Sequence, residues 1–286
     1  MKFPKLLQKG DTIGICAPSS GASGEKRSMR LDNAVRNIKT LGYELIETAS
    51  VRCDDKCVSA SSEIRVAEFM NLYETPNVAA ILPPWGGEFL MDMLPHLDFE
   101  KLAAIPAKWV CGYSDMSTLT FTLTLNSDIA TIHGSNLMNM GYARIHDSDM
   151  RAFDVMSNRT TEQKSWDTWG GFSSWDDFTG EVYNLDKPST WKSLQGDERV
   201  SFDGMMIGGC LEIPCARCSV LDLLQLNRSW ISINGMVLYG RLKAAKWKRR
   251  IFIELFGKCG SAGGSSIVTG LYLAVPMGIR TNAILR

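Results

Sequence analysis

The sequence predicts an α/β fold, a mostly parallel sheet with flanking helices, followed by a second, smaller α/β or β-rich domain that is incomplete. Two observations predict the sheet. Short apolar runs alternate with helical segments through the first half of the chain, and most of these runs end in loops rich in Gly, Pro or Ser. Strands that alternate with helices favour a parallel sheet covered on both faces. A third observation, the loss of this pattern beyond Pro214, predicts that the second domain is incomplete.

The expected strands and helices can be placed in order along the chain. The strands are short apolar runs at residues 12–17, 44–48, 78–82 and 109–112. The first helix covers residues 25–41, where apolar residues recur at helical spacing before the stop signal Gly42. A second helix covers residues 62–73 and ends before Pro76. A third is expected in the segment MSTLTFTLTL.

The composition changes between residues 160 and 192, where Trp, Gly, Ser and Asp are abundant. This texture indicates a linker or a binding loop. Tryptophans in such a segment can close a domain seam or hold a ligand, and both interpretations stay open for Trp191. The expected organisation is an α/β domain, a linker with a binding loop, and an incomplete carboxyl-terminal domain, at residues 1–165, 166–200 and 201–286.

Composition and charge argue against several classes of protein. Lys plus Arg and Asp plus Glu both total 31, so no net charge favours nucleic acid or an anionic membrane. The amino terminus has no apolar stretch suited to a signal peptide, and no later run approaches the roughly 18 to 20 residues of a membrane span. Eight cysteines suit free thiols in a reducing compartment. We therefore expect a cytoplasmic protein whose partner is a small molecule or peptide.

The strongest chemical signal is the tetrapeptide GYSD at residues 112–115, between a strand and a helical segment. A serine at a sharp strand-to-helix turn projects its hydroxyl into the crevice at the carboxyl ends of the strands. The N–H of Asp115 would then lie at a helix N-terminus, which favours a developing oxyanion. The turn differs from G-x-S-x-G because Met116 replaces the last glycine. The plain alternative is a helix N-cap made by Ser114 or Asp115.

A second loop, PPWGGE at residues 83–88, follows the preceding strand and should lie beside the serine at the same sheet edge. Gly86 and Gly87 would let the backbone approach a bound carbonyl and offer N–H groups to it. Trp85 and Glu88 are the substrate-binding candidates of this loop. A plain Gly-Gly turn is the alternative.

Several motifs together are similar to one known family. KGDTIGICAPSS, ILPPWGGEFLMDMLPHLDFE, GYSDMSTL, ATIHGSN, TWKSLQG and IGGCLE resemble the LD-carboxypeptidase family of serine peptidases, especially its microcin C immunity-type branch, over residues 5–213. The resemblance implies a hydrolase that cuts amide bonds near a free carboxylate, in murein tetrapeptides or aminoacyl-nucleotide-like compounds. It assigns Ser114 as the nucleophile, with the backbone amides of Asp115 and of Gly86 or Gly87 as the oxyanion hole. It implies no cofactor and no metal, and a homodimer is one possible assembly.

The second half of the chain departs from the family pattern. The resemblance implies a base histidine near the carboxyl end, oriented by a glutamate that follows a strand of the second domain. The three histidines, His96, His133 and His146, all precede that domain, and His133 is expected to be structural. After the strand expected at residues 235–239 comes the basic run GRLKAAKWKRR, where the resemblance implies carboxylates.

This departure predicts a carboxyl-terminal part that is divergent or frame-shifted, and therefore truncated relative to the family. Displacing the codons from Lys243 by one base permits EGCEMEAADIYRTLWEMRQ, an acidic amphipathic helix. The same displacement from Ser265 permits FKHCNGLVFGRTDGYTDKRD, which resembles the family's strand and loop. Residues 214–234 permit a displaced segment that contains GT-x-FAP.

Two other interpretations of the tail stay open. The basic run could contact nucleic acid or a membrane surface, although the rest of the chain offers no basic groove with interleaved aromatics. Cys215 and Cys218 have the spacing of zinc ligands, with Cys210 and Cys259 as further thiols, but no second close pair completes the site.

The sequence thus predicts a serine hydrolase domain that carries Ser114 and most of the oxyanion hole. The chain as written is expected to be inactive, because the base and its orienting glutamate are missing. The alternative is a non-catalytic remnant that binds a carboxylate-bearing ligand in the PPWGGE cleft.

Overall fold

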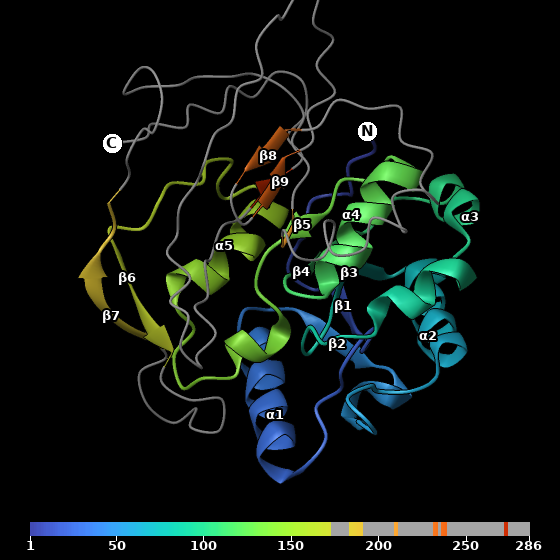
Figure 1. The fold of residues 1–286 in the computed structure, drawn as a ribbon, viewed down its shortest axis with the longest axis horizontal. Coiled ribbons are helices and arrows are strands. Elements are labelled where there is room, and N and C mark those ends of the chain that lie inside the picture. Colours follow the sequence, from blue (N-terminus) through green and yellow to red (C-terminus); the bar gives the residue numbers. More distant parts are fainter. Residues whose placement is uncertain (173–182, 191–208, 211–230, 234–235, 239–271, 274–286) are drawn as a thin grey trace, which may run out of the picture.

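The computed structural model describes residues 1–172, 183–190, 209–210, 231–233, 236–238 and 272–273. At its centre lies a six-stranded sheet with the order β10-β5-β4-β3-β1-β2 (Figure 1). Strand β10 pairs antiparallel with β5, and the other five strands run parallel. The strands are β1 Thr12–Ile15, β2 Glu44–Glu47, β3 Val78–Leu82, β4 Trp109–Gly112, β5 Ile132–His133 and β10 Tyr272–Leu273. The predicted mostly parallel sheet is confirmed.

Helices flank this sheet, as predicted. The α-helices are α1 Glu25–Thr40, α2 Ser62–Glu74, α3 Phe99–Ala104, α4 Met116–Ser127 and α5 Asp147–Met156, and the 3-10 helices are η1 Ala49–Arg52, η2 Leu90–His96 and η3 Leu137–Met140. The three helices expected from the sequence correspond to α1, α2 and α4. None of the described helices has the length and apolarity that crossing a membrane requires.

Two hydrophobic cores form on the two faces of the sheet. One core packs α1 and α5 against the strands and includes Leu31 and Phe153. The other packs α2, α3 and α4 and includes Phe69. Strand β3 contributes to both, because Leu82 belongs to the first core and Ile81 to the second. This is the alternation that a strand covered on both faces requires.

Helix α4 is buried at every residue from Met116 to Thr124, although its sequence alternates Thr with Leu or Phe. Such alternation is typical of a strand with one face in the core. In the helix, the hydroxyls of Thr120, Thr122 and Thr124 donate to the carbonyl oxygens four residues earlier, at 3.2, 2.7 and 3.1 Å. The buried hydroxyls are therefore satisfied locally, and the helix can be buried on all sides.

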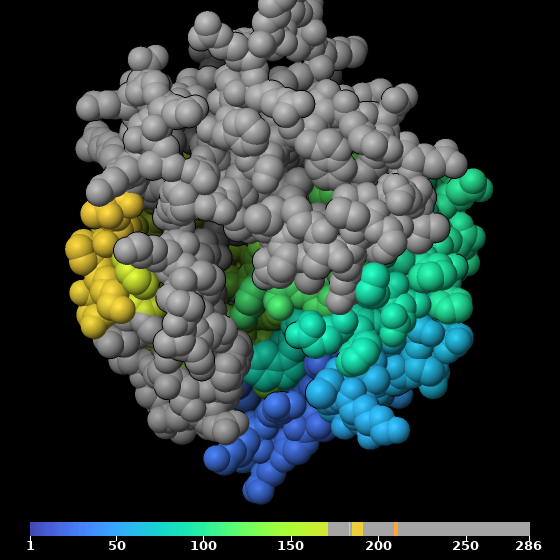
Figure 2. Space-filling model, viewed as in Figure 1, coloured from blue at the N-terminus to red at the C-terminus, as the bar shows by residue number. Residues whose placement is uncertain are grey.

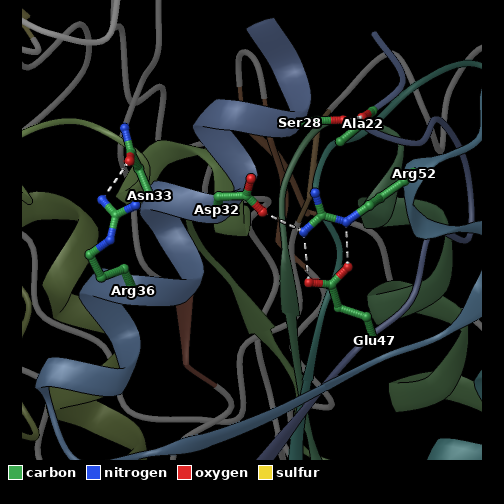
Figure 3. Close-up of polar contacts among 7 residues, drawn as sticks. All are labelled: Ala22, Ser28, Asp32, Asn33, Arg36, Glu47 and Arg52. Atoms are coloured by element: carbon green, nitrogen blue, oxygen red, sulfur yellow. Dashed lines mark hydrogen bonds and ion pairs between the residues drawn. The ribbon is translucent and has the colours of Figure 1, made fainter. Parts of the chain in front are cut away.

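One arginine ties the edge strand β2 to helix α1. Arg52 donates from Nε and Nη2 to the two carboxylate oxygens of Glu47 at 2.8 and 3.0 Å (Figure 3). Its Nη2 also reaches Asp32 on α1 at 2.7 Å. Near the start of the same helix, Ser28 donates to the carbonyl oxygen of Ala22 at 3.2 Å. Exposed ion pairs contribute only about 0–1 kcal/mol, so this contact fixes geometry more than it adds stability.

The predicted linker and binding loop at residues 166–200 contains regular structure. Strands β6 Thr168–Phe172 and β7 Tyr183–Pro188 pair antiparallel. Figure 2 shows this strand pair at the left edge of the molecule, opposite α2 and α3. A further antiparallel pair joins β8 Ile231–Ile233 to β9 Met236–Leu238, and β9 lies within the strand expected at 235–239. The domain boundaries remain predictions.

Several predictions lie outside the described residues. They concern Trp191, the basic run after residue 240 and almost all of the segments with displaced codons. The incompleteness of the carboxyl-terminal domain stays a prediction for the same reason.

Candidate functional site

The candidate site lies at the carboxyl ends of the parallel strands, where the strand order reverses. Strand β1 pairs with β2 on one side and with β3 on the other, so the chain leaves it in opposite directions. Ligands of open α/β sheets bind at such a switch point. The loops after β1 and β3 meet there, since the N–H of Ser20 donates to the carbonyl oxygen of Gly86 at 3.1 Å.

Ser114 follows β4 and has a φ of 62°, in the left-handed region. A residue with a side chain adopts this conformation at a cost of about 1 kcal/mol or more. Asp115 occupies the N-cap position of α4, and its side chain makes no capping hydrogen bond. A plain helix cap leaves the left-handed serine unexplained, whereas a nucleophile turn requires a sharp, strained bend at the serine.

Gly86 lies directly against this serine. A Cβ built on Gly86 would lie 2.8 Å from Ser114 Cβ, 2.9 Å from Ser114 Oγ and 3.1 Å from the backbone nitrogen of Asp115. Because a real Cβ does not fit, this position needs glycine. The loop after β3 and the N–H of Asp115 therefore both border the serine hydroxyl.

Gly87 faces the loop after β1 instead. Its φ is +150°, and a Cβ there would collide with Ser19 Oγ and lie 2.6 Å from Ser20 Oγ. The two glycines that the sequence analysis treated together thus have different neighbours. Gly86 adjoins the hydroxyl of Ser114, and Gly87 lets the loops after β1 and β3 pack closely.

The carboxylate of Asp115 links the loop after β1 to the residues that follow the PPWGGE loop. It is fully buried and accepts hydrogen bonds from Ser19 Oγ at 2.7 Å and from the N–H of Leu90 at 2.9 Å. The hydroxyl of Thr118 lies 3.4 Å from its other oxygen. One side chain of the GYSD motif therefore holds the loop after β1 and the start of η2.

Arg65 braces the same two loops. It is buried on α2 and donates to the carbonyl oxygen of Pro18 at 2.7 Å and to that of Phe89 at 2.9 Å. Burial lowers its pKa below the usual range of arginine, and the nearby Asp92 and Asp115 oppose this shift. We call Asp115, Ser19, Leu90 and Arg65 the Asp115 cluster.

On the other side of the serine, Asn136 holds the preceding residue. Its Oδ1 accepts the N–H of Tyr113 at 3.1 Å, and its Nδ2 donates to the Tyr113 carbonyl oxygen at 3.5 Å. Sequence reasoning missed this residue. The signal was the motif IHGSN, whose first two residues form β5 and whose asparagine lies shortly after the end of that strand.

A second buried carboxylate, also missed, lies beyond Asn136. Asp149 on α5 accepts from Ser135 Oγ at 2.6 Å and from the hydroxyl of Tyr183 on β7 at 2.9 and 3.1 Å. Burial raises the pKa of Asp149 to about 6, although these hydrogen bonds and the charge of Arg30 oppose the shift.

The other predicted substrate contacts are placed as follows. Trp85 is half-buried, and its ring centroid lies 5.2 Å from the guanidinium carbon of the buried Arg30. Arg30 also stacks on Tyr142 at 4.2 Å. Glu88 is exposed beside the loop glycines.

The three histidines have the following local contacts. His133 is buried, its Nδ1 lies 3.3 Å from Ser117 Oγ, and burial lowers its pKa to about 4. The N–H of Cys210 donates to the same Ser117 hydroxyl at 3.1 Å. His146 caps α5, and His96 ends η2. This geometry suits the structural role expected for His133.

The described residues contain no group of three or more His, Cys, Asp or Glu side chains arranged to hold a metal ion. Of the four cysteines considered as zinc ligands, Cys210 is described and is partly buried. The other three lie outside the described residues.

Comparison with known proteins agrees with this geometry. Residues 13–134 match the family model described as the LD-carboxypeptidase N-terminal domain. A putative carboxypeptidase from Vibrio cholerae is 30% identical over 216 residues, which are 74% of this chain and 63% of the relative. A probable murein peptide carboxypeptidase from Bacillus subtilis is 28% identical over 144 residues, 50% of this chain and 44% of the relative.

A solved structure shows the same fold. It is an MccF-like protein from Streptococcus pneumoniae in complex with AMP, with a TM-score of 0.66 and 20% identity, covering 77% of this chain and 69% of that one. The matched part of this chain spans less than two thirds of the length of each of the two carboxypeptidase relatives. The resemblance to the LD-carboxypeptidase family that the motifs predict is thus confirmed over residues 13–134, which match the model of its N-terminal domain.

Proposed function

We propose that Ser114 is the nucleophile of a serine peptidase site that cuts an amide bond near a free carboxylate. The supporting observation is the left-handed Ser114 between β4 and α4, packed so closely against Gly86 that no Cβ fits there. The N–H of Asp115 and that of Gly86 or Gly87 would stabilise the oxyanion formed when the serine attacks the amide carbonyl. Collapse of this intermediate would break the C–N bond and release the amine with the proton given up by the serine, and water would then hydrolyse the acyl-enzyme to a carboxylic acid and free serine.

Such an attack needs a base, because a serine hydroxyl is a poor nucleophile near neutral pH. We propose that this chain as written has almost no turnover. His133 contacts Ser117 Oγ through its Nδ1, and burial lowers its pKa to about 4, which makes it a weak base. In well-studied serine proteases, loss of triad members leaves only about 10³ to 10⁴-fold acceleration over water. That residual is hard to detect on an unactivated amide.

The proposed substrates are a murein tetrapeptide or an aminoacyl-nucleotide-like compound. The name of the Bacillus subtilis relative favours the first, and the AMP bound by the Streptococcus pneumoniae protein favours the second. Trp85 and Glu88, which flank the glycines of the loop after β3, are proposed to contact the substrate, together with Trp191. A non-catalytic protein that binds the same ligands is the alternative, favoured by the placement of the histidines.

A chemical rescue experiment tests the nucleophile even if turnover is absent. Imidazole in the buffer can replace a missing base, and an activated p-nitrophenyl ester needs little help for its leaving group. We expect imidazole to accelerate ester cleavage by the wild-type chain and to have no protein-dependent effect on Ser114→Ala. Equal acceleration in both proteins would remove Ser114 from the role of nucleophile.

Two further assays separate enzyme from binder. The wild type and Ser114→Ala are compared for hydrolysis of an L,D-linked murein tetrapeptide and of an aminoacyl-sulfamoyl nucleotide, and for labelling by a fluorophosphonate. We expect the nucleotide to bind without measurable turnover. Turnover or labelling that disappears in Ser114→Ala would show that the chain supplies its own base, and His133 would then be the first residue to mutate.

A further inference from the structure

Behind the turn that carries Ser114 lies a buried polar cluster that the proposed chemistry does not use. Its members come from five separate elements or loops of the fold, and all but two of them are fully or almost fully buried. We call it the Asp149 cluster: Tyr113, Ser135, Asn136, Asn139, Asp149 and Tyr183.

The contacts form a continuous path from Asp149 to the serine. Asp149 accepts the hydroxyl of Ser135 at 2.6 Å. The next residue, Asn136, grips both the N–H and the carbonyl oxygen of Tyr113, at 3.1 and 3.5 Å. Tyr113 is bonded to Ser114. Two side-chain contacts therefore separate the Asp149 carboxylate from the peptide group next to the proposed nucleophile.

A second branch of the path reaches the β6–β7 strand pair. The hydroxyl of Tyr183, the first residue of β7, donates to Asp149 at 2.9 Å. Asn139 Nδ2 lies 3.4 Å from that hydroxyl, and the edge of the Tyr183 ring meets His146, with centroids 5.2 Å apart. Asp149 is thus the point where the strand pair is joined to the loop that follows β5.

The environment makes this carboxylate dependent on its partners. Burial of a carboxylate is unfavourable unless hydrogen-bond donors compensate for the lost water. Ser135 and Tyr183 are the donors that contact it, and Arg30 from α1 is the nearby cation. Asp149→Asn removes the charge and replaces one acceptor oxygen with an N–H donor, so it weakens the hold on Ser135 and, through it, on the neighbouring Asn136.

We propose that Asp149 is a positioning residue of the Ser114 site. By holding Ser135 it fixes Asn136, and Asn136 fixes the Tyr113 peptide group from which the left-handed serine departs. Only the catalytic part of this proposal, that Asp149 positions a nucleophile, rests on the proposed function. The mechanical link from Asp149 to Tyr113 exists whether or not the chain turns over a substrate.

Amide hydrogen exchange measures that link directly. The N–H of Tyr113 donates to Asn136, so its protection factor reports the grip of that side chain. At pH 7 we expect Asp149→Asn to lower this factor about tenfold or more relative to the factor of Phe69, a core residue of α2 on the other face of the sheet. Ser135→Ala, a milder change, should give a loss in the same direction.

A matched control separates this effect from general destabilisation. Asp154 lies on the same helix, and its carboxylate accepts Arg159 Nε at 2.8 Å near the surface. Asp154→Asn should leave the Tyr113 factor unchanged. If Asp149→Asn lowers the factors of Tyr113 and Phe69 equally, or loosens β7 while Tyr113 stays protected, the positioning role is overturned.

A rate measurement then tests the catalytic meaning. With imidazole and the activated ester, Asp149→Asn should slow acylation of Ser114 about tenfold with little change in KM, because the serine and not the ester is displaced. An unchanged rate in a variant that has lost Tyr113 protection would overturn the positioning role. No imidazole-dependent acylation in the wild type would count against the proposed function instead, and the exchange result would stand apart from it.

Discussion

Two fully buried carboxylates hold the turn of Ser114 from opposite sides, and they do so with different donors. Asp115 accepts a backbone N–H, that of Leu90, and the hydroxyl of Ser19. Asp149 accepts the hydroxyls of Ser135 and Tyr183. A backbone N–H can only donate, whereas a hydroxyl can rotate and accept. The Asp115 side is therefore a fixed scaffold, and the Asp149 side is able to rearrange when its carboxyl takes up a proton.

The largest expected difference between the two sides is in the free energy of unfolding that is lost when each carboxylate is removed. We expect Asp115→Ala to lower the free energy of unfolding by about 3–5 kcal/mol, because it leaves the buried Leu90 N–H and Ser19 without an acceptor. Asp149→Ala should lower it by about 1–3 kcal/mol, since the freed hydroxyls can turn to other acceptors. Urea denaturation measures both, with Asp154→Ala expected within about 1 kcal/mol of the wild type. Equal losses for the two buried carboxylates would remove the distinction.

The pH dependence of stability should sharpen the comparison. Burial raises the pKa of Asp149 from 3.8 to about 6, so its contribution to stability is full below pH 4 and is lost as the pH rises through 6. Burial lowers the pKa of His133 from 6.5 to about 4, so its contribution is full above pH 6.5 and is lost as the pH falls through 4. Each shift corresponds to about 3 kcal/mol. Between pH 4 and 6 the two oppose each other.

Replacing Asp149 or His133 alone should reveal the contribution of each residue to the pH dependence of stability. Relative to the wild type, Asp149→Asn should become less stable as the pH falls from 6 to 4, and His133→Gln should become more stable over the same interval. Denaturant midpoints in steps of one pH unit measure both curves, and other carboxyl groups cancel in the difference. Two variants with parallel curves would contradict the opposite signs.

The close packing of the loops offers a test that changes no charge. Gly87→Ala should cost about 2–3 kcal/mol, because its Cβ would collide with Ser19 and disturb the Asp115 cluster. Gly10→Ala is the matched control, since Gly10 also has a positive φ of 90° but no atom within 4 Å of a built Cβ. Its cost should be the backbone term alone, about 1 kcal/mol. Thermal or urea denaturation gives the difference, and equal costs would argue against steric contact at Gly87.

The sequence predicts the sheet well because its signals are local. The apolar runs of β1, β3 and β4 and the helical spacing of α1 depend on neighbours within a few residues. The Thr-rich α4 was expected as a helix although its alternation favours a strand, and burial on all sides explains the conflict. The pairing of β6 with β7 was not predicted, because the Trp- and Gly-rich segment resembles a linker in composition.

The candidate site also has one part that the local sequence predicts and one part that it does not. On the Asp115 side, the contiguous motifs GYSD and PPWGGE predict Asp115, Gly86 and Gly87. Ser19, Leu90 and Arg65, which contact Asp115 or brace the same loops, were not predicted. The Asp149 side is assembled from residues 113, 135, 136, 139, 149 and 183, and nothing in the local sequence marks Asp149 as the partner of Tyr183. Trp85 shows a further limit, because a substrate contact and the observed packing on Arg30 call for the same aromatic residue.

The smallest expected effect concerns the strain that the two sides hold in place. Ser114 has a φ of 62°, so Ser114→Gly should raise the free energy of unfolding by about 1 kcal/mol, while Ser114→Ala keeps the strained backbone and should change it little. Asn158→Gly is the control, because Asn158 has a similar φ of 57° outside the site and asparagine tolerates this region well. Its gain should be smaller.

If Asp149 restrains the strained turn, Asp149→Asn should also destabilise the Ser114→Gly protein less than the wild type, and the double-mutant cycle measures that coupling. If the effects of Asp149→Asn and Ser114→Gly are strictly additive, and Ser114→Gly still gives its full gain in the free energy of unfolding, the restraint lies on the Asp115 side alone.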